Sequence, residues 1–156
     1  MASQFTVLIG VTNSHASLEA VTAAGPIVRA RRAKVILGHV LEVARHLPLQ
    51  ERQEVEARRG DQVLRRAEEA AKEAGYHAAG ELLQAREAGQ GILDEARDKE
   101  VDLIVLGVPA HREFGGFSLG RTAEYVLRHA SCEVWVVRGS TTPSHAHHES
   151  YEVERR

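Results

Sequence analysis

The sequence has very few cysteines and aromatic residues, and it has no long hydrophobic run. Cys132 is the single cysteine, so the chain can form neither an internal disulfide framework nor a cysteine-based zinc site. Aromatic residues make up only 4% of the chain, which argues against an aromatic binding surface. No apolar run approaches the roughly 20 residues needed to span a bilayer, and the N-terminus lacks the features of a signal peptide. We therefore expect a cytoplasmic protein without membrane insertion.

The sequence also lacks an excess of charge of either sign. Its 20 Lys and Arg residues face 22 Asp and Glu residues, for a net charge of −2, so nucleic acid is excluded as a main partner by the absence of a general positive field. We find no Ser/His/Asp order, HExxH motif or paired carboxylates that would demand an enzyme, and we predict no catalytic residues and no metal site. The 156 residues, 43% of them hydrophobic, fit one globular domain.

Short β-branched runs alternate with helical patterns along the chain. The runs predict buried strands at residues 5–11, 34–40, 77–86, 101–106 and 132–138. Between them we expect a first helix that Gly25-Pro26 kinks or splits, then helices at 61–74, 90–99 and 119–130. Residues 41–60 look like a polar connection with a short helical end. Such alternation predicts an α/β fold, a doubly wound parallel sheet of five strands in the order 3-2-1-4-5.

The composition changes after Gly139. We expect a domain over residues 1–139 and a disordered, His-rich tail over residues 140–156. His145, His147 and His148 could capture a metal ion, but flexible imidazoles without fixed geometry bind weakly, so a solvated tail is the favoured interpretation.

The segment that follows the fourth expected strand is the most informative part of the chain. In an open parallel sheet, ligands bind outside the carboxyl ends of the strands. Between residues 107 and 122, glycines, hydroxyls and the arginines Arg112 and Arg121 precede a helix, so backbone N–H groups and the helix dipole could face a phosphate. Alternatively, the glycines only shape a long loop, because the spacing matches neither the P-loop nor GxGxxG.

Residues 101–107, 120–130 and 132–138 resemble the C-terminal half of a domain of the universal stress protein (UspA-like) family. Residues 5–14 and 35–40 match the first two strands of that domain, so the resemblance covers roughly residues 4–139. It implies a five-stranded parallel sheet of the Rossmann-like, adenine nucleotide alpha-hydrolase-like type that commonly dimerises through its last strand. Some members of the family bind ATP or AMP and others do not.

The resemblance extends to the nucleotide-binding pattern G-x2-G-x9-G-[ST]. Gly107 and Gly120 match, whereas Ala110 and Arg121 replace the second glycine and the hydroxyl residue, and Thr122 lies one residue late. Thr12 stands where an acidic residue is usual. The resemblance implies a site for ATP or AMP, with Mg²⁺ as a companion ion, and Val40 against the adenine. The implied site residues are Val11, Thr12, Asn13, Val40, Leu106, Gly107, Val108, Ala110, Arg112, Gly120, Arg121 and Thr122.

Two functions from different classes follow. The first is a non-enzymatic stress-response regulator that binds an adenine nucleotide. The resemblance also allows slow ATP hydrolysis, but no residue in this sequence stands out as a base that would activate water. The second is a dimeric interaction module without nucleotide binding. Thr12-Asn13 and Leu47-Pro48-Leu49 resemble domains associated with amino-acid permeases, which points to regulation of a membrane transporter.

The last expected strand would lie at the edge of the sheet. It is too apolar to remain bare, so we predict an antiparallel homodimer through Val134, Trp135, Val136 and Val137. Two other residues are given structural roles: His39 is expected to be a buried, hydrogen-bonded strand residue rather than a catalytic base, and Cys132 a small core residue.

Overall fold

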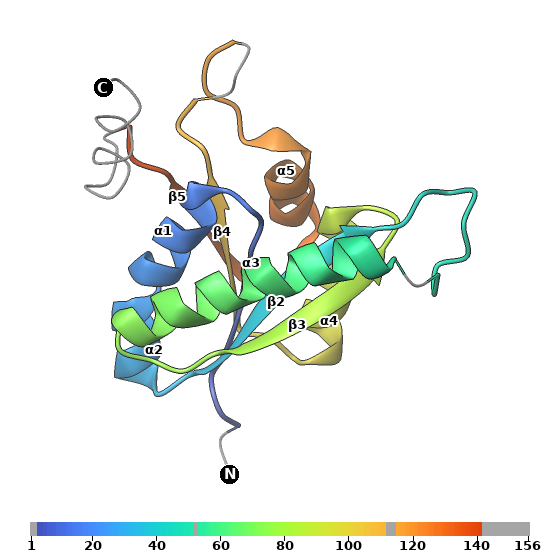
Figure 1. Ribbon diagram of the computed structural model, residues 1–156. Helices are drawn as coiled ribbons and strands as arrows, with labels where there is room; N and C mark the ends of the chain where they lie inside the picture. Colours follow the sequence, from blue (N-terminus) through green and yellow to red (C-terminus); the bar gives the residue numbers. More distant parts are fainter. Residues whose placement is uncertain (1–2, 52, 112–114, 142–156) are drawn as a thin grey trace, which may run out of the picture.

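One parallel five-stranded sheet organises the protein, in the order β3-β2-β1-β4-β5. The computed structural model describes residues 3–51, 53–111 and 115–141 (Figure 1). The strands are β1 (Thr6–Gly10), β2 (Lys34–Glu42), β3 (Ala79–Ala85), β4 (Leu103–Val108) and β5 (Glu133–Arg138). The helices are α1 (His15–Ala23), α2 (Gly25–Arg31), α3 (Glu54–Glu73), α4 (Ala88–Asp98) and α5 (Gly120–His129). The predicted doubly wound, Rossmann-like fold and its strand order are confirmed.

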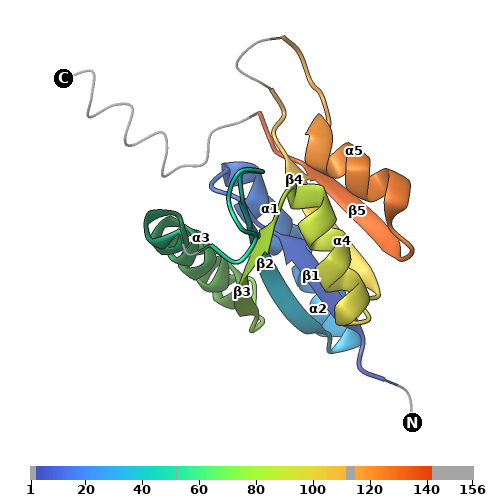
Figure 2. The same ribbon diagram turned by 90° about the vertical axis from the view of Figure 1, so that its right-hand side faces the viewer.

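Helices cover both faces of the sheet, in two layers (Figure 2). The first layer is α1, α2 and α3, packed on a core that includes Val7, Ile9 and Val105. The second layer is α4 and α5, packed on a core that includes Leu8, Ile104 and Leu106. Neighbouring residues of β1 and β4 point to opposite layers because side chains alternate along a strand. Continuous apolar runs are therefore the expected pattern for these strands.

The first helical segment is split, as Gly25-Pro26 predicts. Ser14 caps α1 by accepting a hydrogen bond from the Ser17 backbone, and α1 ends at Ala24 as its C-cap. Pro26 then lies in the first turn of α2, where the missing N–H costs no helical hydrogen bond. The proline therefore starts a second helix rather than kinking one long helix.

Several expected boundaries are wrong, among them those of α3 and β4. Helix α3 begins at Glu54, well before the expected Asp61, and Gly60 lies inside it. The glycine is required there for packing, because a Cβ on Gly60 would lie 2.5 Å from Leu82 Cδ2 and 2.9 Å from His39 Cδ2. Strand β4 begins at Leu103 and continues to Val108, so it is displaced toward the cavity described below.

The edge strand β5 presents its side chains to both layers. Val134 and Val136 pack on the second layer and Val137 on the first, whereas Trp135 stays 37% exposed. The expected tail lies almost entirely outside the described residues, which end at 141. Within the described part of the chain, no helix has the length and apolar content to cross a membrane.

Candidate functional site

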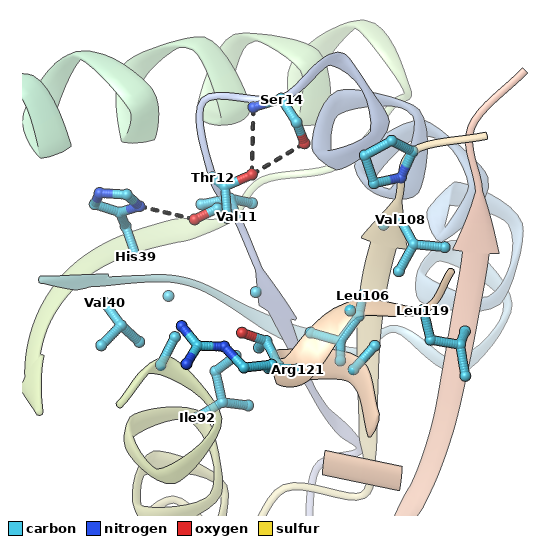
Figure 3. Close-up of a pocket in the computed structure, with 18 residues that line it drawn as sticks. Val11, Thr12, Ser14, His39, Val40, Ile92, Leu106, Val108, Leu119 and Arg121 are labelled. Atoms are coloured by element: carbon cyan, nitrogen blue, oxygen red, sulfur yellow. Dashed lines mark hydrogen bonds between the residues drawn. The ribbon is translucent and has the colours of Figure 1, made fainter. Parts of the chain in front are cut away.

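A cavity of about 390 Å³ opens at the carboxyl ends of β1, β2 and β4, beside the starts of α4 and α5 (Figure 3). Strand order reverses at this place, since β1 has β2 on one side and β4 on the other. Open α/β sheets place their ligands at this switch point. The cavity is lined by Gly10, Val11, Thr12, Ser14, Gly38, His39, Val40, Ala88, Ile92, Leu106, Gly107, Val108, Pro109, Leu119, Gly120, Arg121, Thr122 and Ala123.

Most of the predicted binding residues meet in this lining, but two of the described ones do not. Val11, Thr12, Val40, Leu106, Gly107, Val108, Gly120, Arg121 and Thr122 line the cavity. Asn13 points instead to a hollow beside α3, where its Oδ1 accepts a hydrogen bond from Arg66 at 3.4 Å. Ala110 is buried outside the lining, and Arg112 falls outside the described residues.

The turn between β1 and α1 forms one wall of the cavity, and hydroxyl groups hold it in place. The Thr12 backbone N–H donates to Ser17 Oγ at 2.9 Å. Thr12 Oγ1 lies 3.0 Å from Ser14 Oγ and 3.1 Å from Ser17 Oγ. Ser17 is 1% exposed, so this cluster satisfies a buried polar group while it fixes the turn. The wall is therefore set before any ligand arrives.

His39 reinforces the same wall from β2. Its Nδ1 lies 2.8 Å from the carbonyl oxygen of Val11 (Figure 3). A carbonyl oxygen only accepts, so Nδ1 carries the proton and donates. The ring thus links β2 to the end of β1, so the hydrogen bond expected of His39 is confirmed. Its expected burial is wrong, because the residue is only half-buried at the lining of an open cavity.

One side of the cavity is apolar. Val40 of β2, Ile92 of α4 and Leu106 of β4 form it. A Cβ on Gly10 would lie 2.7 Å from Leu106 Cδ2 and 3.1 Å from Ile92 Cδ1, so the glycine lets these side chains close over the strand. This surface suits a flat, weakly polar group.

The opposite side favours an anion. Helix α5 begins there at Gly120, and its N-cap residue, Leu119, makes no side-chain capping hydrogen bond. The residues of its first turn line the cavity, so the N-terminus of the helix and its dipole face the cavity. Gly120 has a φ of +81°, a left-handed conformation that favours glycine. Arg121 is exposed, and its side chain points toward the side formed by Val40 and Ile92 (Figure 3).

The donor set does not fit a metal ion held by the protein. Among the described residues, the lining contains hydroxyls, imidazole and backbone carbonyls but no carboxylate, whereas Mg²⁺ is usually bound through at least one. The described residues contain no group of three His, Cys, Asp or Glu side chains that could hold a metal ion.

Comparisons with known proteins agree with this architecture. Residues 5–138 match the universal stress protein family. The chain belongs to that family. A universal stress protein of Methanocaldococcus jannaschii is 29% identical over 138 residues, which cover 85% of this chain and 81% of the relative.

Solved structures of universal stress proteins superpose on the chain. One, in complex with cAMP, has a TM-score of 0.68 at 25% identity and covers 89% of this chain and 100% of that one. Another, from Archaeoglobus fulgidus in complex with dAMP, has a TM-score of 0.70 at 18% identity and covers 85% of this chain and 97% of that one. The second likeness shows the fold alone.

The positions of the family's glycine pattern have different roles in this universal stress protein, whether or not they match the pattern. Gly107 approaches the first layer closely, because a Cβ there would lie 2.2 Å from the Ala16 carbonyl oxygen. A glycine at position 107 is therefore required for packing, whatever binds in the cavity. Ala110 does not line the cavity, so its methyl group takes no space from a ligand. Arg121, in place of a hydroxyl residue, adds a cation to the lining.

Sequence reasoning missed the part of the lining that comes from other elements. Ala88 and Ile92 belong to α4, and Ser14, His39 and Leu119 were given other roles or none. The helical spacing of Ile92, Leu93 and Ala96 predicts only that they share one side of their helix. No motif marks α4 as part of the site, since its position depends on how the crossover after β3 packs against the sheet.

Proposed function

We propose that this universal stress protein is a regulatory protein that binds an adenine nucleotide in the cavity and does not catalyse a reaction. The observation that carries the proposal is the division of one cavity into an apolar side and a side that favours anions, without a carboxylate among the described lining residues. Related proteins of the same fold are known in complex with cAMP and with dAMP, which supports an adenine nucleotide as the ligand.

The apolar side is where the base would lie. Val40 and Ile92 offer aliphatic surfaces from two different elements, and burial of an aromatic ring against such surfaces is favourable by about 25 cal/mol per Å² of apolar area. The cavity volume of about 390 Å³ lies in the lower part of the range of small-molecule sites, roughly 300–1,000 Å³. A mononucleotide is therefore a better match than a larger ligand confined to this cavity.

The phosphate would lie at the start of α5. There the backbone N–H groups, the Thr122 hydroxyl and the Arg121 guanidinium can all donate to phosphate oxygens. Arg121 would supply the charge neutralisation that a metal ion provides elsewhere, because its planar group can pair with phosphate through two hydrogen bonds. Since the lining does not fit a protein-held Mg²⁺, no step of the proposed function passes through one.

The absence of catalysis is proposed on the groups around the phosphate. His39, the imidazole of the lining, uses Nδ1 to bond the Val11 carbonyl, and the lining residues that the structure describes include no carboxylate to activate a water molecule. ATP or AMP would act as a signal whose occupancy changes the protein rather than as a substrate.

The decisive experiment is calorimetric titration with AMP and cAMP, together with the thermal shift that ligand binding must produce. We expect binding, and we expect Gly120→Glu to weaken it more than about tenfold, because a carboxylate enters the anion side. Gly115→Glu is the matched control: Gly115 has a similar φ, +88° against +81°, and a Cβ there would meet nothing within 4 Å. Lack of binding by the unaltered protein would contradict the proposal and favour the dimeric module that acts on a partner such as a transporter.

We also propose a homodimer through β5. Val134, Val136 and Val137 are only half-buried in one copy, Trp135 is exposed, and an unpaired apolar edge strand favours pairing with a second copy. Sedimentation at micromolar concentration should give a dimer that Val136→Lys converts to a monomer; a monomer of the unaltered chain would contradict the dimer but not nucleotide binding.

A further inference from the structure

A second cavity adjoins the proposed nucleotide site. It has a volume of about 450 Å³ and lies where α4 and α5 begin, next to the ends of β2 and β3. Its lining residues are Glu42, Arg86, Glu87, Ala88, Gly89, Arg121, Thr122, Glu124, Tyr125 and Arg128. Ala88, Arg121 and Thr122 line both cavities. The two cavities are therefore separated by one short wall rather than by a packed core.

The shared wall is the part of the site that favours phosphate. Arg121 and Thr122 belong to the first turn of α5, and Ala88 is the first residue of α4. A phosphate bound to Arg121 and Thr122 would thus lie on the boundary between the cavities. Any group joined to that phosphate on the side away from the nucleoside would enter the second cavity.

The second cavity differs in charge from the first. The described part of the first lining has no carboxylate, whereas Glu42, Glu87 and Glu124 line the second. These carboxylates oppose a further phosphate, because like charges repel. They are suitable acceptors for the hydroxyl groups of a sugar, as the acidic residue of dinucleotide-binding folds is for ribose.

The arginines of the second cavity have different duties. Arg86 donates through Nη1 to the carbonyls of Ala44 and Leu47 at 2.6 and 2.8 Å, and so it holds the segment after β2. Arg128 is exposed on α5 and can donate to sugar oxygens. The hydroxyl of Tyr125 already has a partner within the second layer, since it donates to Gln90 Oε1 at 2.6 Å. The residues that could select a ligand are therefore Glu124 and Arg128.

We propose that the ligand extends over Arg121 into the second cavity, and that its chemical class is an adenine nucleotide joined through a diphosphate to a sugar. The inference rests on the proposed function, since it places the adenosine part in the first cavity. The diphosphate occupies the shared wall, and the hydroxyl groups of the sugar meet Glu124 and Arg128. ADP-ribose is the simplest probe of this class.

The test is calorimetric titration of the full chain with AMP, ADP and ADP-ribose. We expect ADP-ribose to bind about tenfold more tightly than ADP, the gain that a hydrogen bond to a charged group typically provides. Arg128→Ala should remove that gain and leave AMP affinity within about twofold. Glu124→Gln, which keeps size and removes charge, should act in the same direction. Arg65→Ala, at an exposed position of α3 outside both cavities, is the matched control.

The outcomes separate the two proposals. If AMP binds but ADP-ribose binds no more tightly than ADP, the extension is wrong and the nucleotide site stands. If Arg128→Ala weakens AMP and ADP-ribose equally, the second cavity holds no part of the ligand. If none of these ligands binds, the proposed function itself is overturned, and the extension with it.

Discussion

The two helical layers are attached to the same sheet in different ways. In the first layer, the segment that follows α3 is linked to α1 by a buried hydrogen bond from Tyr76 Oη to the Val21 carbonyl at 2.6 Å, and α1 touches β4 at Gly107. In the second layer, cavities of about 390 and 450 Å³ open around the starts of α4 and α5. A further hollow of about 250 Å³ lies between Leu93, Tyr125 and Cys132.

The difference indicates that the first layer mainly stabilises the fold and that the second layer mainly provides the ligand site. Close packing and satisfied buried polar groups give the first layer its stability. Hollows of about 420 and 230 Å³ also lie beside α3 and the start of α1, but the cavities of the second layer open at the carboxyl ends of the strands. Packing that leaves cavities sacrifices stability, and at this edge of the sheet it provides space for a ligand. Regions that bind ligands are commonly drawn from the less stable parts of a protein. Substitutions in the first layer away from the cavity lining should therefore change stability without changing affinity, and those at the lining of the second layer should mainly change affinity.

The largest effect should come from Gly107→Val, which places a side chain where β4 and α1 lie in close contact. A Cβ at Gly107 would lie 2.2 Å from the Ala16 carbonyl oxygen and 2.6 Å from its carbon, so α1 must move away from β4. We expect a loss of about 3 kcal/mol in the free energy of unfolding, measured by urea denaturation. Gly116→Val is the control, since a Cβ at Gly116 meets nothing within 4 Å. Equal effects of the two variants would show that the first layer is not closely packed here.

A smaller effect is expected from Tyr76→Phe. Burial raises the pKa of the Tyr76 hydroxyl, so the group stays protonated and donates to Val21. Its removal leaves a buried carbonyl without this partner, at a cost of about 2 kcal/mol. Urea denaturation measures the loss, and titration with AMP should show unchanged affinity. A change in affinity of the same size would break the proposed division between the layers.

The smallest effect is a pH dependence in the second layer. Burial, and then the neighbouring Glu81, raises the pKa of Glu95 on α4, although Lys99 opposes the shift. The raised value means that Glu95 favours folding below its ordinary pKa of 4.5, and that this stability is lost as the pH rises through the folded value. Glu95→Gln should therefore melt higher than the unaltered protein at pH 7 and equally at pH 4.

Thermal melts across this pH range measure the Glu95 effect. Glu69→Gln, at an exposed position of α3, is the control for loss of one negative charge. A Glu95→Gln variant that melts lower at pH 7 would mean that the ion pair with Lys99, at 4.0 Å, outweighs burial.

The fold could be predicted from the sequence because each strand is a local signal. The runs around Val7, Ile36 and Ile104 are apolar over their whole length, as buried parallel strands must be. The start of α3 could not be predicted in the same way, because Gly60 reads as a break. Only the approach of Leu82 and His39 from the sheet explains a glycine there.

The candidate site was predictable where loops follow strands and not where a helix packs over them. Thr12, Val40 and Gly120 follow strands or precede a helix, and the topology brings them together. Asn13 was expected to join Thr12 in the site, yet its side chain lies beside α3, where it accepts a hydrogen bond from Arg66. Ile92 entered the lining through packing alone, which no local pattern encodes.

Trp135 offers a direct view of the edge of the sheet. It is the single tryptophan of the chain, it is 37% exposed on β5, and its Nε1 donates to Glu133 Oε1 at 3.0 Å. Tryptophan emission from this protein therefore comes from one place, far in the sequence from the turn after β1. The unlabelled protein thus carries its own optical probe of what happens at that edge, and its spectrum can be followed while a nucleotide is added.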